Sequence, residues 1–205
     1  MGFIDQLTEK SWLTEGDQAD GTGNRVSVTL PASIFGLRVF LGVAAVLFTL
    51  FFVAYADRMT LGDWRTLPEP WVLWVNTALL ILGSLGMQRA RNAADRAQMD
   101  VVKAGLLAGG GCAVAFLFGQ LLAWQQLMAL GYYAAANPAN AFFYVITAVH
   151  ALHLLGGLVA WCRTAAKVWR DDEVGKIRIS VELCAVYWHF LLVVWVVLFG
   201  LLLFT

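Results

Sequence analysis

A chain of 205 residues that is 60% hydrophobic and carries nine tryptophans has more apolar surface than a soluble domain of this size can bury. Its 14 basic and 14 acidic residues balance, so its charge gives no reason to expect a nucleic-acid partner. The three cysteines, Cys112, Cys162 and Cys184, form no Cys-x-x-Cys pair, and we interpret them as small apolar packing residues. The composition therefore predicts a polytopic membrane protein.

The first thirty or so residues are polar and contain the loop-like stretch GDQADGTGN. They have no apolar core of the kind that a cleavable signal peptide needs. We predict a polar cytoplasmic tail over residues 1–32, with the part around Trp12 lying on the membrane surface. The remainder, residues 33–205, is predicted to form one transmembrane domain.

Five apolar segments follow the tail, each close to the roughly 20 residues that a helix needs to cross a bilayer. Prolines precede the second segment, at Pro68 and Pro70, and Asn137-Pro138 precedes the fourth. The predicted fold is therefore all-α, a membrane helix bundle with five transmembrane helices. Gly105 and Gly109 have the spacing of a close helix contact. The segments run from about Ile34 to Tyr55, Trp71 to Met87, Ala104 to Leu130, Phe142 to Cys162 and Ile179 to Phe204.

Basic residues are distributed very unevenly between the two predicted sides of the membrane. Twelve of them flank the segments on one side and only two, Arg58 and Arg65, lie on the other. Because cytoplasmic loops are enriched in Lys and Arg, the N-terminus is predicted to be cytoplasmic and, after five spans, Thr205 periplasmic. The basic side holds Lys10, Arg25, Arg38, Arg89, Arg91, Arg96, Lys103, Arg163, Lys167, Arg170, Lys176 and Arg178.

The last two apolar segments contain all three histidines, His150, His153 and His189, and the carboxylate Glu182. His153 lies ten residues before Arg163, roughly 15 Å along a helix, and His189 lies eleven residues after Arg178, roughly 16 Å. The two histidines are therefore predicted to lie at one level near the middle of the membrane. Glu182 shares a helix face with His189 and is within ion-pair reach of Arg178, which lies four residues away.

Three roles compete for these groups. Neutral imidazoles can hydrogen-bond between helices and hold a bundle in register. Together with Arg163 and Arg178, they can form one polar seam between the fourth and fifth helices, with anionic lipid at its cytoplasmic end. His153 and His189 can also ligate one haem from opposite helices, although Gly156-Gly157 predicts tight packing beside His153. Ionisable groups at this depth mark a functional site or a packed interior.

The pattern FFYVITAVHALHLLGG resembles the histidine-bearing helix of cytochrome c oxidase subunit III, and VELCAVYWHFLLVVW resembles the helix that closes that family. Asn76-Thr77 and the segment after Gly36 are similar to two of its other helices. The resemblance covers about residues 34 to 204 and fits the five-helix bacterial form. Three family carboxylates are replaced, by Ala44, Ala123 and Leu192, which puts a carboxylate-dependent proton role in doubt.

The resemblance implies a non-catalytic accessory subunit of a respiratory haem-copper oxidase in a bacterial inner membrane. It implies that haem and copper are held by partner subunit I, next to subunit II, that this chain holds no cofactor or metal of its own, and that it binds phospholipid. Rival readings are an accessory subunit of a nitric oxide reductase or other respiratory complex, an independent membrane carrier, and a b-type cytochrome.

Overall fold

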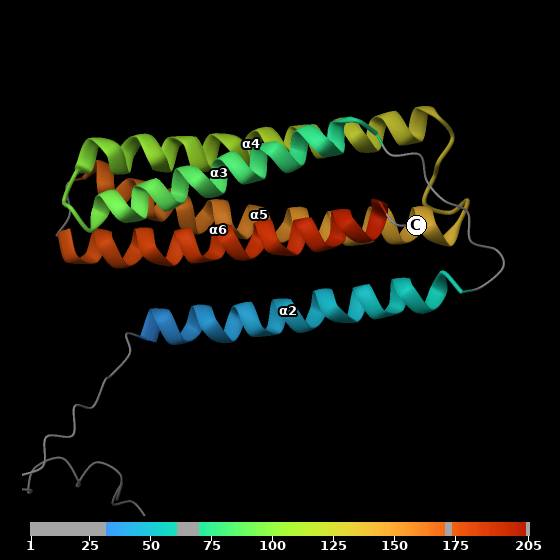
Figure 1. Ribbon diagram of the computed structural model, residues 1–205, viewed down its shortest axis with the longest axis horizontal. Coiled ribbons are helices and arrows are strands. Elements are labelled where there is room, and N and C mark those ends of the chain that lie inside the picture. Colours follow the sequence, from blue (N-terminus) through green and yellow to red (C-terminus); the bar gives the residue numbers. More distant parts are fainter. Residues whose placement is uncertain (1–31, 61–69, 171–173, 204–205) are drawn as a thin grey trace, which may run out of the picture. The chain divides into compact units, whose positions relative to one another are not determined.

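The computed structural model describes residues 32–60, 70–170 and 174–203, and every regular element in this part of the chain is a helix (Figure 1). The prediction of an all-α helix bundle is confirmed, and each predicted apolar segment falls on one helix. The helices are α2 Ala32–Arg58, α3 Val72–Ala94, α4 Met99–Ala129, α5 Pro138–Trp169 and α6 Val174–Leu203. The predicted tail up to Pro31, with Trp12, and the basic residue Arg65 lie outside the described residues.

Four of the described helices, α2, α4, α5 and α6, are long and apolar enough to cross a membrane. The second predicted span, α3, falls short of that apolarity because its 23 residues include Asn76, Ser84, Gln88 and Arg91. Asn76 and Ser84 are buried against other helices, so part of this polarity is hidden inside the bundle. Crossing of the membrane by α3 remains a prediction.

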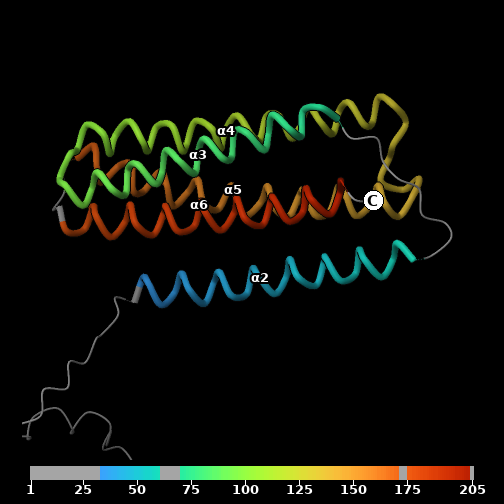
Figure 2. Tube along the Cα trace, viewed as in Figure 1, coloured from blue at the N-terminus to red at the C-terminus, as the bar shows by residue number. Residues whose placement is uncertain are grey.

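Glycines bring α3 and α4 into close contact. A Cβ added at Gly105 would lie 2.6 Å from the carbonyl oxygen of Gly86, and one at Gly109 would lie 2.5 Å from the sulfur of Met87. Such distances leave no room for a side chain, so the predicted contact through Gly105 and Gly109 is confirmed. The partner helix is α3, which precedes α4 in the chain and runs antiparallel to it (Figure 2).

Helix α2 packs on α5 and α6 alone among the described helices. Ala44, Phe48 and Tyr55 on its inner face are buried, whereas Val43, Val46 and Leu50 on its outer face are more than half exposed. A helix with this apolar outer surface suits a lipid environment.

The basic residues of the described chain gather at one end of the helix bundle. Figure 1 shows the start of α2, the α3–α4 turn, the end of α5 and the start of α6 at one end of the bundle, and the α4–α5 turn at the other. The described basic residues of the predicted cytoplasmic side, from Arg89 to Arg178, belong to the first end, while Arg58 closes α2 at the opposite end. The bundle therefore has one basic end and one end that is nearly free of basic side chains in the part described.

Candidate functional site

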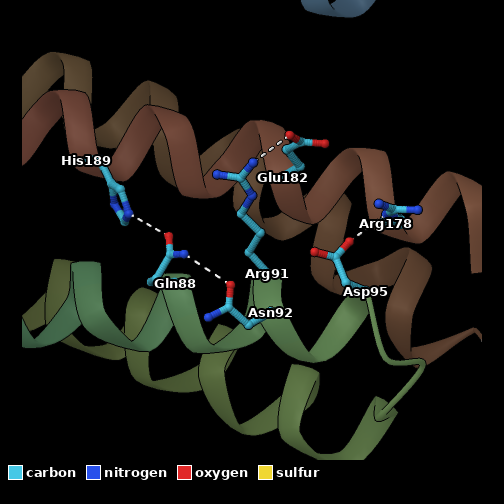
Figure 3. Close-up of polar contacts among 7 residues, drawn as sticks. All are labelled: Gln88, Arg91, Asn92, Asp95, Arg178, Glu182 and His189. Atoms are coloured by element: carbon cyan, nitrogen blue, oxygen red, sulfur yellow. Dashed lines mark hydrogen bonds and ion pairs between the residues drawn. The ribbon is translucent and has the colours of Figure 1, made fainter.

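A ladder of polar contacts joins α3 to α6 over about three helical turns (Figure 3). At its inner end, the Ser84 hydroxyl lies 2.8 Å from Nδ1 of His189, whose Nε2 lies 2.9 Å from Oε1 of Gln88. The Gln88 amide nitrogen in turn donates to Oδ1 of Asn92 at 3.1 Å. We call the outer residues of this ladder the α3–α6 strip. It consists of Gln88, Arg91, Asn92, Asp95, Arg178, Glu182 and His189.

The hydrogen bonds of Gln88 define the tautomer of His189. With the amide assigned so that its nitrogen donates to Asn92, its oxygen can only accept, so Nε2 of His189 carries the proton. Nδ1 of the neutral ring then accepts from the Ser84 hydroxyl. Both ring nitrogens are therefore engaged by α3, which leaves neither free to ligate a metal.

Two ion pairs continue the ladder toward the basic end. Arg91 Nη2 lies 2.8 Å from Oε1 of Glu182, and Arg178 Nε lies 2.6 Å from Oδ1 of Asp95. The predicted pairing of Glu182 with Arg178 on the same helix is thus wrong, and two ion pairs between helices are formed instead. Glu182 and Arg178 pair with α3 because this helix lies directly alongside α6 and presents Arg91 and Asp95 at the matching levels.

His153 lies on the other side of α6 from this ladder. Its Nδ1 donates to the backbone carbonyl of Val149 at 2.8 Å, and its ring packs against Phe40 and Phe48 of α2. The Tyr187 hydroxyl donates to the backbone carbonyl of His153 at 2.7 Å, which agrees with the predicted level of His153 along α6. The predicted single seam of His153, His189 and Glu182 between α5 and α6 is wrong, because Tyr187 and His189 leave α6 in different directions.

His150 is buried completely, between the rings of Phe48, Phe116 and Trp195. Neither of its ring nitrogens has a hydrogen-bond partner in the described part of the chain. The ring therefore acts as an aromatic packing group that joins α2, α4 and α6. It takes no part in the α3–α6 ladder.

A cavity of about 720 Å³ opens between α2, α5 and α6, beside His153. Its walls are mostly apolar and include Leu37, Phe40 and Trp188, while Arg163, Lys167 and Ser180 line its basic end. Lys167 donates to the Ser180 hydroxyl at 3.0 Å. The expected tight packing beside His153 is right for Gly157, where an added Cβ would lie 2.5 Å from Tyr187, but wrong for Gly156, which faces open space.

Arg163 lines the cavity, whereas Arg178 belongs to the α3–α6 strip, so the two arginines serve different features. His153 and His189 face opposite sides of α6 and do not form a bis-histidine haem site. The described residues contain no group of three or more His, Cys, Asp or Glu side chains that is arranged to hold a metal ion.

Two of the three positions at which the family that this chain resembles carries carboxylates are buried. Ala44 is 2% exposed and Ala123 is 0% exposed, and Leu192 packs partly buried against the core. Next to Ala123 in the chain, the Trp124 indole donates to the hydroxyl of Thr147. In this chain the two positions are part of the apolar packing.

The α3 half of the ladder was not predicted from the sequence. Ser84, Gln88, Arg91 and Asp95 recur at spacings of four, three and four residues, which places them on one helix face. Arg178, Glu182 and His189 have the matching pattern on α6. This double periodicity is the signal that could have revealed the partners.

Comparison with known proteins gives a consistent result, although no family model matches the chain. A cytochrome c oxidase subunit 3 of Synechocystis sp. is 30% identical over 176 residues, which cover 81% of this chain and 72% of that protein. A probable cytochrome c oxidase subunit 3 of Nocardia farcinica is 27% identical over 187 residues, covering 89% and 90%. A heme-copper oxidase subunit I+III of Aeropyrum pernix is 27% identical over 128 residues, which cover 62% of this chain and 16% of that longer protein.

Proposed function

This chain belongs to the cytochrome c oxidase subunit 3 family, and we propose that it serves as the accessory, non-catalytic subunit of a haem-copper terminal oxidase. The observation that carries this proposal is the similarity to oxidase subunits 3 over more than four fifths of the chain. The geometry supports it, because the polar groups are used to join helices and both nitrogens of His189 are occupied. The relatives favour an oxidase over a nitric oxide reductase, a carrier or a b-type cytochrome.

The partners follow from the same premise. A relative in which subunits I and III form one chain supports a place for this protein beside subunit I. Haem and copper would then be held by the catalytic subunit I, next to subunit II, and this chain would carry no redox centre. Its contribution would be to the durability and surroundings of the catalytic subunit.

The cavity between α2, α5 and α6 has the chemistry of a phospholipid site. Its apolar walls suit acyl chains, and Arg163 and Lys167 at one end suit a phosphate, since each basic group near the membrane surface is worth about 1 kcal/mol toward anionic lipid. We therefore assign lipid binding to this cavity, with Arg163 retained from the predicted set. The predicted seam residues Glu182, His189 and Arg178 are reassigned to helix pairing.

We propose that this multi-pass membrane protein lies in a bacterial inner membrane with its basic end in the cytoplasm. Five crossings, including α3, would place the C-terminus in the periplasm. A reporter that is active only in the periplasm, fused after Thr205, should then be active, with a fusion in the loop before Val174 as the inactive control. Activity of the control fusion alone would contradict this orientation.

Purification of the complex through a tag on this chain tests the proposed function. We expect subunit I to co-purify, with a reduced-minus-oxidised spectrum of haem. A preparation that contains the chain in its folded helical form, without any oxidase subunit, would overturn the proposal.

A further inference from the structure

The α3–α6 strip is partly open to the outside of the bundle. The side chains of Arg91 and Glu182 are 38% and 42% exposed, and those of Asp95 and Arg178 are 47% and 60% exposed. Asn92 is exposed and Gln88 is half-buried. Polar side chains of α3 and α6 therefore lie on the outer surface of the bundle.

This face differs from the outer faces of the helices on the other side of the bundle. The middle turns of α4 and α5 expose Leu107, Val114 and Phe118, and Leu155 and Val159. Such surfaces are satisfied by lipid chains. Lipid chains offer no hydrogen bonds to the side-chain amides of Gln88 and Asn92, and polar groups inside a membrane are costly unless protein or water meets them.

Depth separates the strip from the water at the membrane surface. His189 lies eleven residues along α6 from Arg178, roughly 16 Å, and Gln88 lies seven residues along α3 from Asp95, roughly 10 Å. The outer ion pair can be met by water at the basic end. His189 lies well inside the predicted span Ile179 to Phe204, and Gln88, which contacts it from α3, directly follows the last residue of the predicted span Trp71 to Met87.

The strip is also separate from the lipid cavity. Tyr187, Leu183 and Cys184 line the cavity on one side of α6, whereas Glu182 and His189 face α3 on another. Helix α2 covers the cavity side and makes no contact with α3. Within the described chain, nothing packs over the outside of the strip as α2 does over the cavity.

We propose that the α3–α6 strip is the face that docks a membrane-spanning helix of the catalytic subunit. This inference rests on the proposed function and identifies the contact surface. The relative that joins subunits I and III in one chain is the reason to choose subunit I as the occupant. Because the four charges of the strip form two neutral pairs, the docked helix presents uncharged hydrogen-bonding side chains at the level of Gln88 and Asn92.

Photocrosslinking in the intact complex tests the proposal. The photoreactive residue p-benzoylphenylalanine is placed at Asn92 and, as a control, at Phe118 on the exposed apolar face of α4. We expect an adduct with subunit I from position 92 and none from position 118. Adducts from position 92 with lipid alone, or with a second copy of this chain, would overturn the proposal.

A second variant pair guards against disturbance by the bulky probe. Gln88→Leu with Asn92→Leu removes amides from the strip, and Gln125→Leu with Gln126→Leu removes two exposed amides from α4. The strip pair should lose two hydrogen bonds to subunit I. We therefore expect this variant to bind subunit I about eightfold more weakly, measured as retention of subunit I during detergent washing. The α4 pair should retain it fully. Equal retention by both pairs would contradict the proposal.

Co-purification of the wild-type chain with oxidase subunits tests the proposed function independently of the docking face. If it does and position 92 forms no adduct with subunit I, the docking face is wrong and the function stands. If it does not, the function itself fails.

Discussion

Glu182 on α6 pairs with Arg91 on α3 at 2.8 Å, although Arg178 lies only one turn away on its own helix. Arg178 is drawn instead to Asp95 of α3. Two helices that are far apart in the sequence are thereby joined by charges of alternating sign. The arrangement fixes the register of α3 against α6 from the basic end inward.

A double-mutant cycle should measure this pairing directly. Glu182→Gln and Arg91→Gln, singly and together, should show a favourable coupling of less than about 1 kcal/mol, because both side chains are about two fifths exposed. The same cycle with Arg178→Gln should show coupling near zero. The measurement is the free energy of unfolding of the purified chain in detergent, and a larger coupling to Arg178 would contradict the structure.

His189→Leu should weaken the bundle without emptying the lipid cavity. It removes two interhelical hydrogen bonds, each worth about 0.6 kcal/mol on average, so unfolding should become easier by about 1 kcal/mol. Phospholipid content should stay unchanged, because His189 faces away from the cavity. Lipid phosphorus per complex and the unfolding midpoint are the two readouts.

Substitutions at the basic end of the cavity should have the opposite effect to His189→Leu, namely less bound lipid in an intact bundle. Arg163→Gln with Lys167→Gln should reduce anionic phospholipid and leave the bundle intact, whereas Arg89→Gln with Arg96→Gln removes the same charge away from the cavity and should keep the lipid. Loss of lipid from the His189→Leu complex would contradict this assignment and support the single seam predicted from the sequence, in which His189 and the lipid site belong together.

Neighbouring glycines on α5 provide a further test of the packing. Gly157→Ala should destabilise the chain by about 1–3 kcal/mol, because the new methyl group meets the ring of Tyr187, which is held by its hydrogen bond to His153. Gly156→Ala faces open space and should be neutral or stabilising by up to about 1 kcal/mol, since Ala favours a helix. Equal effects of the two substitutions would show that α6 does not pack here as described.

Hydropathy predicted the helices well because each long apolar run needs a helix to satisfy its backbone in a membrane. The number of residues between His153 and Arg163 also indicated the level of His153 in the membrane. It did not determine which direction each side chain leaves its helix. Tyr187 and His189 are two residues apart and therefore point to different neighbours, a consequence of 3.6 residues per turn that decides the site.

The partner of α6 was also missed, for a physical reason. Consecutive helices are expected to be neighbours, and α5 does contact α6, but α3 lies alongside α6 as well. Asn76, Thr77 and Ser84 are polar residues in an apolar segment, and the sequence does not show their partners. In the fold, Asn76 donates to Gln120, Thr77 accepts from the indole of Trp195, and Ser84 meets His189. Polar residues of α3 therefore connect it to α4 and α6.

Selective removal of this chain from the purified oxidase complex tests the accessory role most directly. Haem and copper, together with oxygen consumption measured at once after removal, should remain with the partner subunits, since both nitrogens of His189 are engaged by Ser84 and Gln88 and His153 faces another side of α6. Departure of haem or copper with this chain, or immediate loss of oxygen reduction, would contradict the account.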